Sequence, residues 1–152
     1  MANLGAILAN RGHYFTPHLI RSEENESYVD EHKLGIDRKY YDVVIDGMEQ
    51  VVSMGSGIRG YIPDIVLCGK TSTVENSHGL DHSGFMGFAP KESPQIAVAA
   101  YVENVGWGGR AAGSTASLLV EKYIRGEVTR PWLEEYVKRG YFGDERPAEE
   151  SD

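Results

Sequence analysis

Three β-rich runs separated by short linkers constrain the fold of this chain more than any other feature of its sequence. The runs cover 65–76, 83–89 and 95–104, and glycine or proline punctuates the linkers between them. Linkers of this length favour antiparallel pairing of consecutive strands, because a parallel crossover needs a dozen or more residues. The second half of the chain is therefore predicted to form a three-stranded antiparallel meander.

The third run is apolar on both of its faces. Alternate side chains of a strand point to opposite faces of the sheet. One face of this run carries Ile96, Val98, Ala100 and Val102, and the other carries Ala97, Ala99 and Tyr101. A strand with two apolar faces is covered on both sides, so we expect this run to be a central strand.

Helical patterns flank the strands at 1–11, 41–54 and 112–124. Their apolar positions are expected to face the core: Leu4, Ile7 and Leu8 in the first, Val44, Met48, Val51 and Val52 in the second, and Ala116, Leu119, Val120 and Tyr123 in the third. Gly12 and Gly126 stand where the first and last helices should end. The predicted class is α+β, with a final helix returning onto an antiparallel sheet.

Length and charge exclude several classes of protein. The 152 residues fit one compact domain, and the net charge of -8 repels phosphate backbones, so no nucleic-acid partner is expected. No stretch of about 20 apolar residues could span a membrane, and no signal peptide or anchor is recognised. The single Cys68 lies in an apolar run and is predicted to be buried. Because Met1 opens within an apolar helical pattern, we interpret the chain as part of something longer.

The segment Gly69-Lys70-Thr71-Ser72-Thr73 is the sharpest local feature. A phosphate-binding loop ends in Gly-Lys-Thr, but it needs a further glycine where this chain has Asp64, and a helix beginning at the lysine. The alternative is a strand that docks an anionic peptide end. Thr71 and Thr73 would point the same way, and hydroxyls beside an ammonium group can bind a carboxylate. A plain strand with a solvated lysine is the third interpretation.

A histidine pair and a tryptophan are further candidates for functional residues. His78 and His82 have helical ligand spacing with Asp81 between them, but Gly79 and the turn context argue against a helix, so no metal site is expected. No cofactor is expected either. Trp107, in a glycine-rich loop, is either a substrate-side aromatic or a cap over the sheet.

Ordered matches along residues 1 to about 126 give this motif a context. They are Met1-Ala2-Asn3-Leu4 with Gly12-His13-Tyr14-Phe15-Thr16-Pro17, Tyr41-Asp42-Val43-Val44-Ile45-Asp46-Gly47-Met48, Gly69-Lys70-Thr71-Ser72-Thr73, Asp81-His82-Ser83, Gly87-Phe88-Ala89-Pro90 and Tyr101-Val102-Glu103-Asn104. In this order they resemble the C-terminal part of the transpeptidase domain of class B penicillin-binding proteins, especially the elongation type. The Lys70 segment stands at the place of the family's Lys-Thr-Gly-Thr motif.

The resemblance implies a fold, a site and a location. The fold would be that of penicillin-binding proteins and serine β-lactamases, an antiparallel sheet with flanking helices, here without the helical lobe. Lys70 would be catalytic, and Thr71, Ser72 and Thr73 would bind the carboxylate of a D-Ala-D-Ala stem peptide or a β-lactam. The backbone N–H of Thr73 would serve an oxyanion hole. The parent protein would cross-link peptidoglycan at the outer, periplasmic face of the bacterial cytoplasmic membrane.

The chain departs from the family in two ways. No serine has lysine three residues on or asparagine two residues on, so the nucleophile motif Ser-x-x-Lys and the motif Ser-x-Asn are both missing. Ser72 stands in place of a family glycine, and a side chain there would crowd the cleft. We therefore expect a transpeptidase fragment that is inactive alone. A non-catalytic peptide- or protein-binding module and a folded remnant without ligand are the alternatives.

Three segments are expected. Residues 1–126 would be the transpeptidase portion, 127–142 a terminal helix or extension, and 143–152 an acidic disordered tail. A fragment without its helical lobe should expose apolar surface, which predicts a homodimer.

Overall fold

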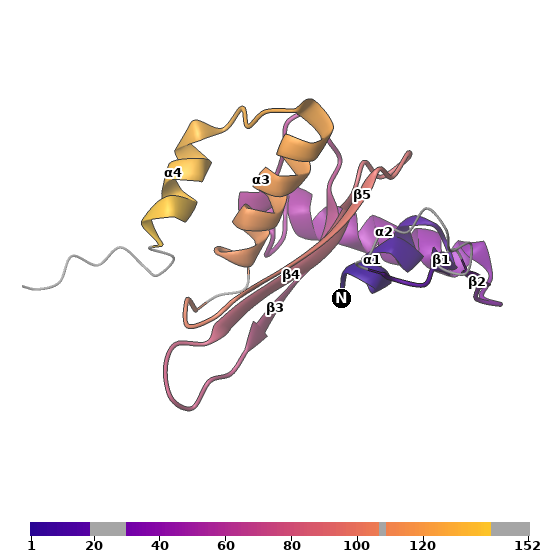
Figure 1. Ribbon diagram of the computed structural model, residues 1–152, viewed down its shortest axis with the longest axis horizontal. Helices are drawn as coiled ribbons and strands as arrows, with labels where there is room; N and C mark the ends of the chain where they lie inside the picture. Colours follow the sequence, from indigo (N-terminus) through magenta and orange to yellow (C-terminus); the bar gives the residue numbers. More distant parts are fainter. Residues whose placement is uncertain (19–29, 107–108, 141–152) are drawn as a thin grey trace, which may run out of the picture.

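The computed structural model describes residues 1–18, 30–106 and 109–140. Its elements run in the order α1 (Ala2–Ala9), β1 (His13–Phe15), β2 (Glu31–Lys33), α2 (Arg38–Ser53), the 3-10 helix η2 (Ile58–Gly60), β3 (Cys68–Val74), β4 (His82–Ala89), β5 (Ile96–Val102), α3 (Ala112–Arg125) and α4 (Pro131–Arg139). Figure 1 shows the three long strands side by side, with α3 and α4 on one side of the sheet and α1 on the other. The structure confirms the α+β class.

The main sheet has the strand order β3-β4-β5, and both pairs are antiparallel. This confirms the predicted meander. The expectation that the third run is a central strand is wrong for the described residues, because β4 lies in the centre and β5 pairs only with β4. A separate two-stranded ladder joins β1 to β2, with Tyr14 opposite His32.

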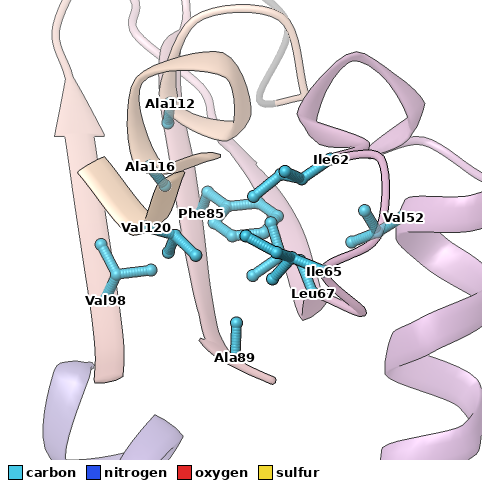
Figure 2. Close-up of a cluster of buried hydrophobic side chains, with 10 residues drawn as sticks. All are labelled: Val52, Ile62, Ile65, Leu67, Phe85, Ala89, Val98, Ala112, Ala116 and Val120. Carbon is cyan, nitrogen blue, oxygen red and sulfur yellow. The ribbon is translucent and has the colours of Figure 1, made fainter. Parts of the chain in front are cut away.

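The larger core lies between α3 and the sheet. Figure 2 shows the ring of Phe85 in the centre of this cluster, with α3 on one side and the segment before β3 on the other. The buried members are Val52, Ile62, Ile65, Leu67, Phe85, Ala89, Val98, Ala112, Ala116 and Val120. The small residues of α3 let the helix approach the strands closely, so the core is a thin layer filled mainly by one aromatic ring.

A second core covers the opposite face of the sheet. Here α1 and α2 pack on Cys68, Met86 and Phe88, with Ala9, Tyr41, Ile45 and Met48 as the buried residues of the two helices. Helix α2 begins at Asp37, whose carboxylate accepts a hydrogen bond from the N–H of Lys39 at 3.1 Å. Gly12 follows α1 with a φ of +106°, as its predicted place at the helix end requires.

Two helices differ in orientation from the sequence prediction. In α2 the buried positions are Tyr41, Ile45, Met48 and Val52, whereas Val44 is exposed. In α3 the sheet side is built from Ala112, Ala116 and Val120, so that Leu119 and Tyr123 are 53% and 62% exposed. The apolar stripe of each helix is wide enough for either the predicted or the observed face to pack inward. In α3 the small side chains of Ala112 and Ala116 determine which face approaches the sheet.

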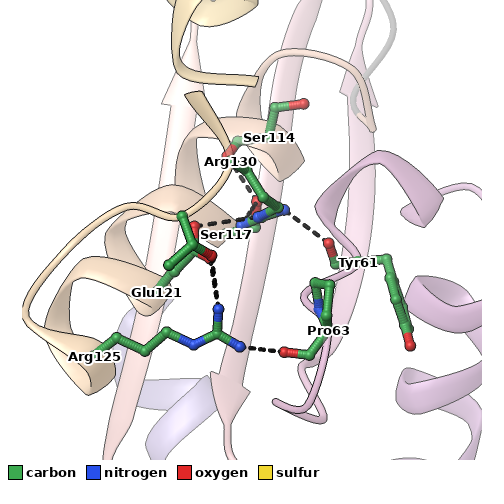
Figure 3. Close-up of polar contacts among 8 residues, drawn as sticks. Tyr61, Pro63, Ser114, Ser117, Glu121, Arg125 and Arg130 are labelled. Carbon is green, nitrogen blue, oxygen red and sulfur yellow. Dashed lines mark hydrogen bonds and ion pairs between the residues drawn. The ribbon is translucent and has the colours of Figure 1, made fainter. Parts of the chain in front are cut away.

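A buried ionic cluster attaches the segments around α3. Glu121 is fully buried, and Arg130 donates to its carboxylate at 3.2 Å. Arg130 also donates to the hydroxyl of Ser117 and to the carbonyl oxygen of Tyr61, at 3.2 and 2.7 Å. Figure 3 shows that Arg125, at the end of α3, donates to the carbonyl oxygen of Pro63. Burial lowers the pKa of the Arg130 guanidinium from its usual value, and the charge of Glu121 opposes that effect.

Helix α4 lies within the segment 127–142, for which a terminal helix or extension was predicted, and it contacts α3. The division into segments stays a prediction, and the tail 143–152 lies outside the described residues. Among the described helices none is long and apolar enough to cross a bilayer.

Replacing Arg130 by methionine should destabilise the fold by about 1.5–3 kcal/mol, because the buried carboxylate of Glu121 would lose a charge-assisted hydrogen bond and keep only those from Arg125 and Thr129. The free energy of unfolding in urea measures the effect. Arg139→Met is the matched control, since Arg139 pairs with Glu135 on the surface of α4, and it should cost less than about 1 kcal/mol. Equal losses of unfolding free energy in both variants would show that the buried pair of Arg130 and Glu121 contributes no more than a surface pair.

Candidate functional site

All four predicted site residues lie on one strand, β3. The backbone stays extended from Cys68 through Val74, so no helix begins at Lys70 and the phosphate-loop interpretation is wrong. Register with β4 places Thr71 opposite Phe85 and Thr73 opposite Ser83, on the face covered by α3. By alternation, Lys70 and Ser72 point to the other face.

The hydroxyl of Thr71 is held by a residue that the sequence analysis did not single out. Thr71 is 8% exposed, and its Oγ1 lies 2.6 Å from Oγ of Ser56, which follows α2. Gly109 packs so closely on Ser56 that a Cβ there would collide with the Ser56 carbonyl oxygen. The contact therefore joins the end of α2, the edge strand and the loop before α3.

Lys70 brings its ammonium group to the plane of the sheet. Its Nζ donates to the carbonyl oxygen of Thr71 at 2.6 Å. Strand carbonyls lie in the sheet plane, so the charge sits at the level of the backbone, between the faces that carry Thr71 and Ser72. The ammonium group therefore lies at the strand backbone rather than on the face that carries the hydroxyls of Thr71 and Thr73.

Ser72 does not disturb the strand, because its cross-strand neighbour is glycine. Ser72 pairs with Gly84, and the Ser72 hydroxyl occupies the space that a Cβ on Gly84 would need. The expectation that Ser72 crowds the cleft stays a prediction. Beside this pair is a groove of about 330 Å³, lined mainly by Met1, Leu4, Lys70, Ser72, Met86 and Tyr101.

The start of α3 lies over the end of the Thr71–Thr73 face. The N–H of Ala112 donates to Oγ of Ser83 at 3.0 Å, and Ser83 is opposite Thr73. The N-terminus of a helix carries partial positive charge, which favours an anion nearby. Thr73 is thus the predicted site residue whose cross-strand partner contacts this helix end.

Side-chain amides stabilise the turn after β3. Asn76 donates to Oδ1 of Asn104 at 2.6 Å, and the N–H of Asn104 donates to Nδ1 of His82 at 3.0 Å. His78 lies in a turn, so it does not share a helix face with His82. No group of three metal-ligating side chains occurs among the described residues. Trp107 lies outside them.

Cys68 offers no alternative nucleophile. The thiol is buried at the start of β3, and burial raises its pKa to about 12. The thiol therefore stays protonated at neutral pH, and thiolate chemistry is not available there.

Removing the Ser56 hydroxyl should weaken the fold through Thr71. In a double-mutant cycle of Ser56→Ala and Thr71→Val, we expect a coupling free energy of about 1 kcal/mol, because the two hydroxyls share one half-buried hydrogen bond. Urea unfolding of the four proteins gives the value. The cycle of Ser53→Ala with Thr71→Val is the control and should be additive. Additivity in both cycles would contradict the contact.

Comparison with known proteins places these residues in a family. The family model described as the penicillin binding protein transpeptidase domain matches residues 1–121. The peptidoglycan D,D-transpeptidase MrdA of Acinetobacter baumannii is 29% identical over 140 residues, covering 78% of this chain and 20% of that protein. The chain thus spans about a fifth of the length of this relative.

Solved structures agree with the sequence match. The D,D-transpeptidase domain of the peptidoglycan glycosyltransferase from Eggerthella lenta has a TM-score of 0.69 and 28% identity, covering 82% of this chain and 31% of that one. Pseudomonas aeruginosa PBP2, in complex with WCK 5153, has a TM-score of 0.60 and 28% identity, covering 86% and 31%. Since the family match covers most of the chain and the structural neighbours share its fold, the chain belongs to the penicillin-binding protein transpeptidase family.

Proposed function

We propose that this chain is the carboxylate-binding part of a peptidoglycan D,D-transpeptidase and that it is catalytically inactive alone. The observation that carries the proposal is the composition of β3. This strand is at the edge of the sheet among the described residues, and it presents an ammonium group and three hydroxyls along seven residues. Charge-assisted hydrogen bonds of this kind suit a carboxylate.

The roles of the site residues follow from their positions. Lys70 supplies positive charge at the level of the strand backbone, close to where the reacting centre would lie. Thr73 offers a hydroxyl to the substrate carboxylate and its backbone N–H to an oxyanion. Thr71 shares its hydroxyl with Ser56, so Ser56 can donate to Thr71 while Thr71 donates to the ligand. Ser72 faces the groove beside Gly84 and contacts the rest of a bound peptide.

Membership of the family supports one substrate class. The carboxylate would belong to the D-Ala-D-Ala end of a peptidoglycan stem peptide, or to a β-lactam that imitates it. The parent protein would work at the periplasmic face of the cytoplasmic membrane. Acylation requires a serine activated by a neighbouring base, and this chain has neither Ser-x-x-Lys nor Ser-x-Asn. Lys70 alone cannot form an acyl-enzyme.

A second candidate function is a non-catalytic module that binds extended peptides or another protein. The outer edge of β3 has no partner strand among the described residues, and this favours the module, because an extended peptide can pair with the backbone of an edge strand. A module of this kind would bind peptides whether or not they end in a free carboxylate. Carboxamide-ended peptides therefore distinguish the two functions. We also propose that the chain forms a homodimer.

Incubation with a penicillin should leave the intact mass unchanged, because no activated serine is available. The same ligand should still raise the melting temperature by binding to β3. At ten times its Kd a ligand stabilises the folded state by about 1.4 kcal/mol, which corresponds to a shift of about 3–5 °C for a domain of this size. A covalent adduct would refute the claim of inactivity. If both the mass and the melting temperature stayed unchanged, the chain would be a folded remnant that binds no ligand.

Lys70→Gln should abolish that shift, because it removes the only charge on β3. Lys33→Gln removes an equal charge from a side chain that is 75% exposed on β2, and it should keep the shift. A shift that survives in Lys70→Gln would mean that the ligand binds elsewhere. A shift obtained equally with a carboxamide-ended peptide would favour the non-catalytic module.

A further inference from the structure

Two arginines from the C-terminal part of the chain bind the backbone of one short segment, residues 58–63. Arg125 donates to the carbonyl oxygen of Pro63, and Arg130 donates to that of Tyr61 at 2.7 Å. Figure 3 shows the two guanidinium groups directed at this segment. Hydrogen bonds from a charged donor are roughly twice as strong as neutral ones. The segment is therefore firmly attached at two of its carbonyl groups.

A third contact with the same segment comes from α4. The guanidinium group of Arg59, in η2, lies over the ring of Tyr136, 5.0 Å from the ring centroid. A cation in this position is attracted by the face of the aromatic ring. The family model matches residues 1–121, so Tyr136 and the whole of α4 lie beyond it. The family assignment gives α4 no role, and a role has to be inferred from these contacts.

The segment 58–63 follows directly on the turn 55–57, and backbone hydrogen bonds join the two. The N–H of Gly60 donates to the carbonyl oxygen of Gly57 at 2.8 Å. The N–H of Gly57 in turn donates to the carbonyl oxygen of Val51, in α2, at 2.9 Å. Because η2 and the turn share these hydrogen bonds, a movement of η2 also moves the turn.

The turn carries Ser56, which contacts the candidate site. Oγ of Ser56 lies 2.6 Å from Oγ1 of Thr71, and the carbonyl oxygen of Ser56 leaves no room for a Cβ on Gly109. A separation of 2.6 Å is at the short end of the range for two hydroxyls, so a displacement of about 1 Å would break the hydrogen bond. Binding groups must be held to within about 0.5 Å of their productive position. The position of the turn therefore matters for the hydroxyl of Thr71.

We propose that α4 supports the carboxylate site, and that Arg130 and Tyr136 are positioning residues which act through η2 and Ser56 on the hydroxyl of Thr71. This inference rests on the proposed function, because it takes Thr71 as a group that binds the carboxylate of a stem peptide or β-lactam. Without these contacts the turn moves away from β3, and water separates the two hydroxyls. Thr71 then loses the partner that orients its hydroxyl toward the carboxylate.

A purely structural role of α4 predicts a different result. If α4 only stabilised the fold, weakening its contacts would speed hydrogen exchange of the most protected amides throughout the domain. A positioning role predicts faster exchange that is confined to the turn and η2, because amides exchange through local openings of the segment to which they belong. Native-state hydrogen exchange therefore distinguishes the two roles.

Tyr136→Ala removes the contact with Arg59. The amides of Gly57 and Gly60 should then exchange about two- to five-fold faster, while those of the central strand β4 keep their rates. Tyr136→Phe keeps the ring and should keep the rates of the unmodified chain. Trp132→Ala removes a 61% exposed ring from the same helix and should also leave the rates unchanged. Equal acceleration in β4 would overturn the positioning role, and so would unchanged rates at Gly57 and Gly60.

Titration calorimetry with a penicillin separates this inference from the proposed function. If the unmodified chain binds the penicillin, Tyr136→Ala should raise the Kd about two- to five-fold and Tyr136→Phe should not. An unchanged Kd in Tyr136→Ala would overturn the positioning role while the proposed function stands. If the unmodified chain binds no penicillin, the proposed function fails and the role at the carboxylate fails with it. Faster exchange at Gly57 would then show only that α4 holds the turn.

Discussion

The packing of Phe85 against glycines is the constraint on which the rest of the structure depends. A side chain on Gly69 would collide with the Phe85 ring, a Cβ on Gly87 would lie 3.0 Å from it, and a Cβ on Gly113 of α3 would lie 3.5 Å from it. Three elements therefore meet around one ring that is 3% exposed. Because Thr71 is paired with Phe85, the same contact sets how far β3 stands from α3. The position of the candidate site is thus a consequence of core packing.

The sequence predicts the elements well and their orientation less well. Short linkers determine the antiparallel meander, and the Gly-Lys-Thr segment falls on a strand as its β-branched residues indicate. The rotation of α2 and α3 could not be predicted, since each helix carries apolar residues over more than one stripe and only the packed sheet selects among them. Ser56 was missed for a similar reason. It is 15 residues from Thr71 in sequence, and no local pattern announces their contact.

Ser72, where the resemblance implies a glycine, is accommodated by the opposite strand. Glycine on an edge strand keeps the surface flat for a ligand. Here the added hydroxyl lies over Gly84, so the bulk gained on β3 is balanced by the missing side chain on β4. The side chain at position 72 and the missing side chain at position 84 therefore pack together across the sheet. The sequence shows both residues, but only the register shows that they are neighbours, and so the replacement does not by itself indicate a damaged site.

Two differences between the sequence pattern and the structure point to the same surface. The third strand has the composition of a central strand, yet it is at the edge of the described sheet. Leu119 and Tyr123 have the spacing of core residues, yet both are exposed. Apolar residues are selected for burial in some state of the protein, and exposed together they form an association surface. The periodicity of this sequence therefore marks more surface for burial than the described residues cover, both along β5 and on α3.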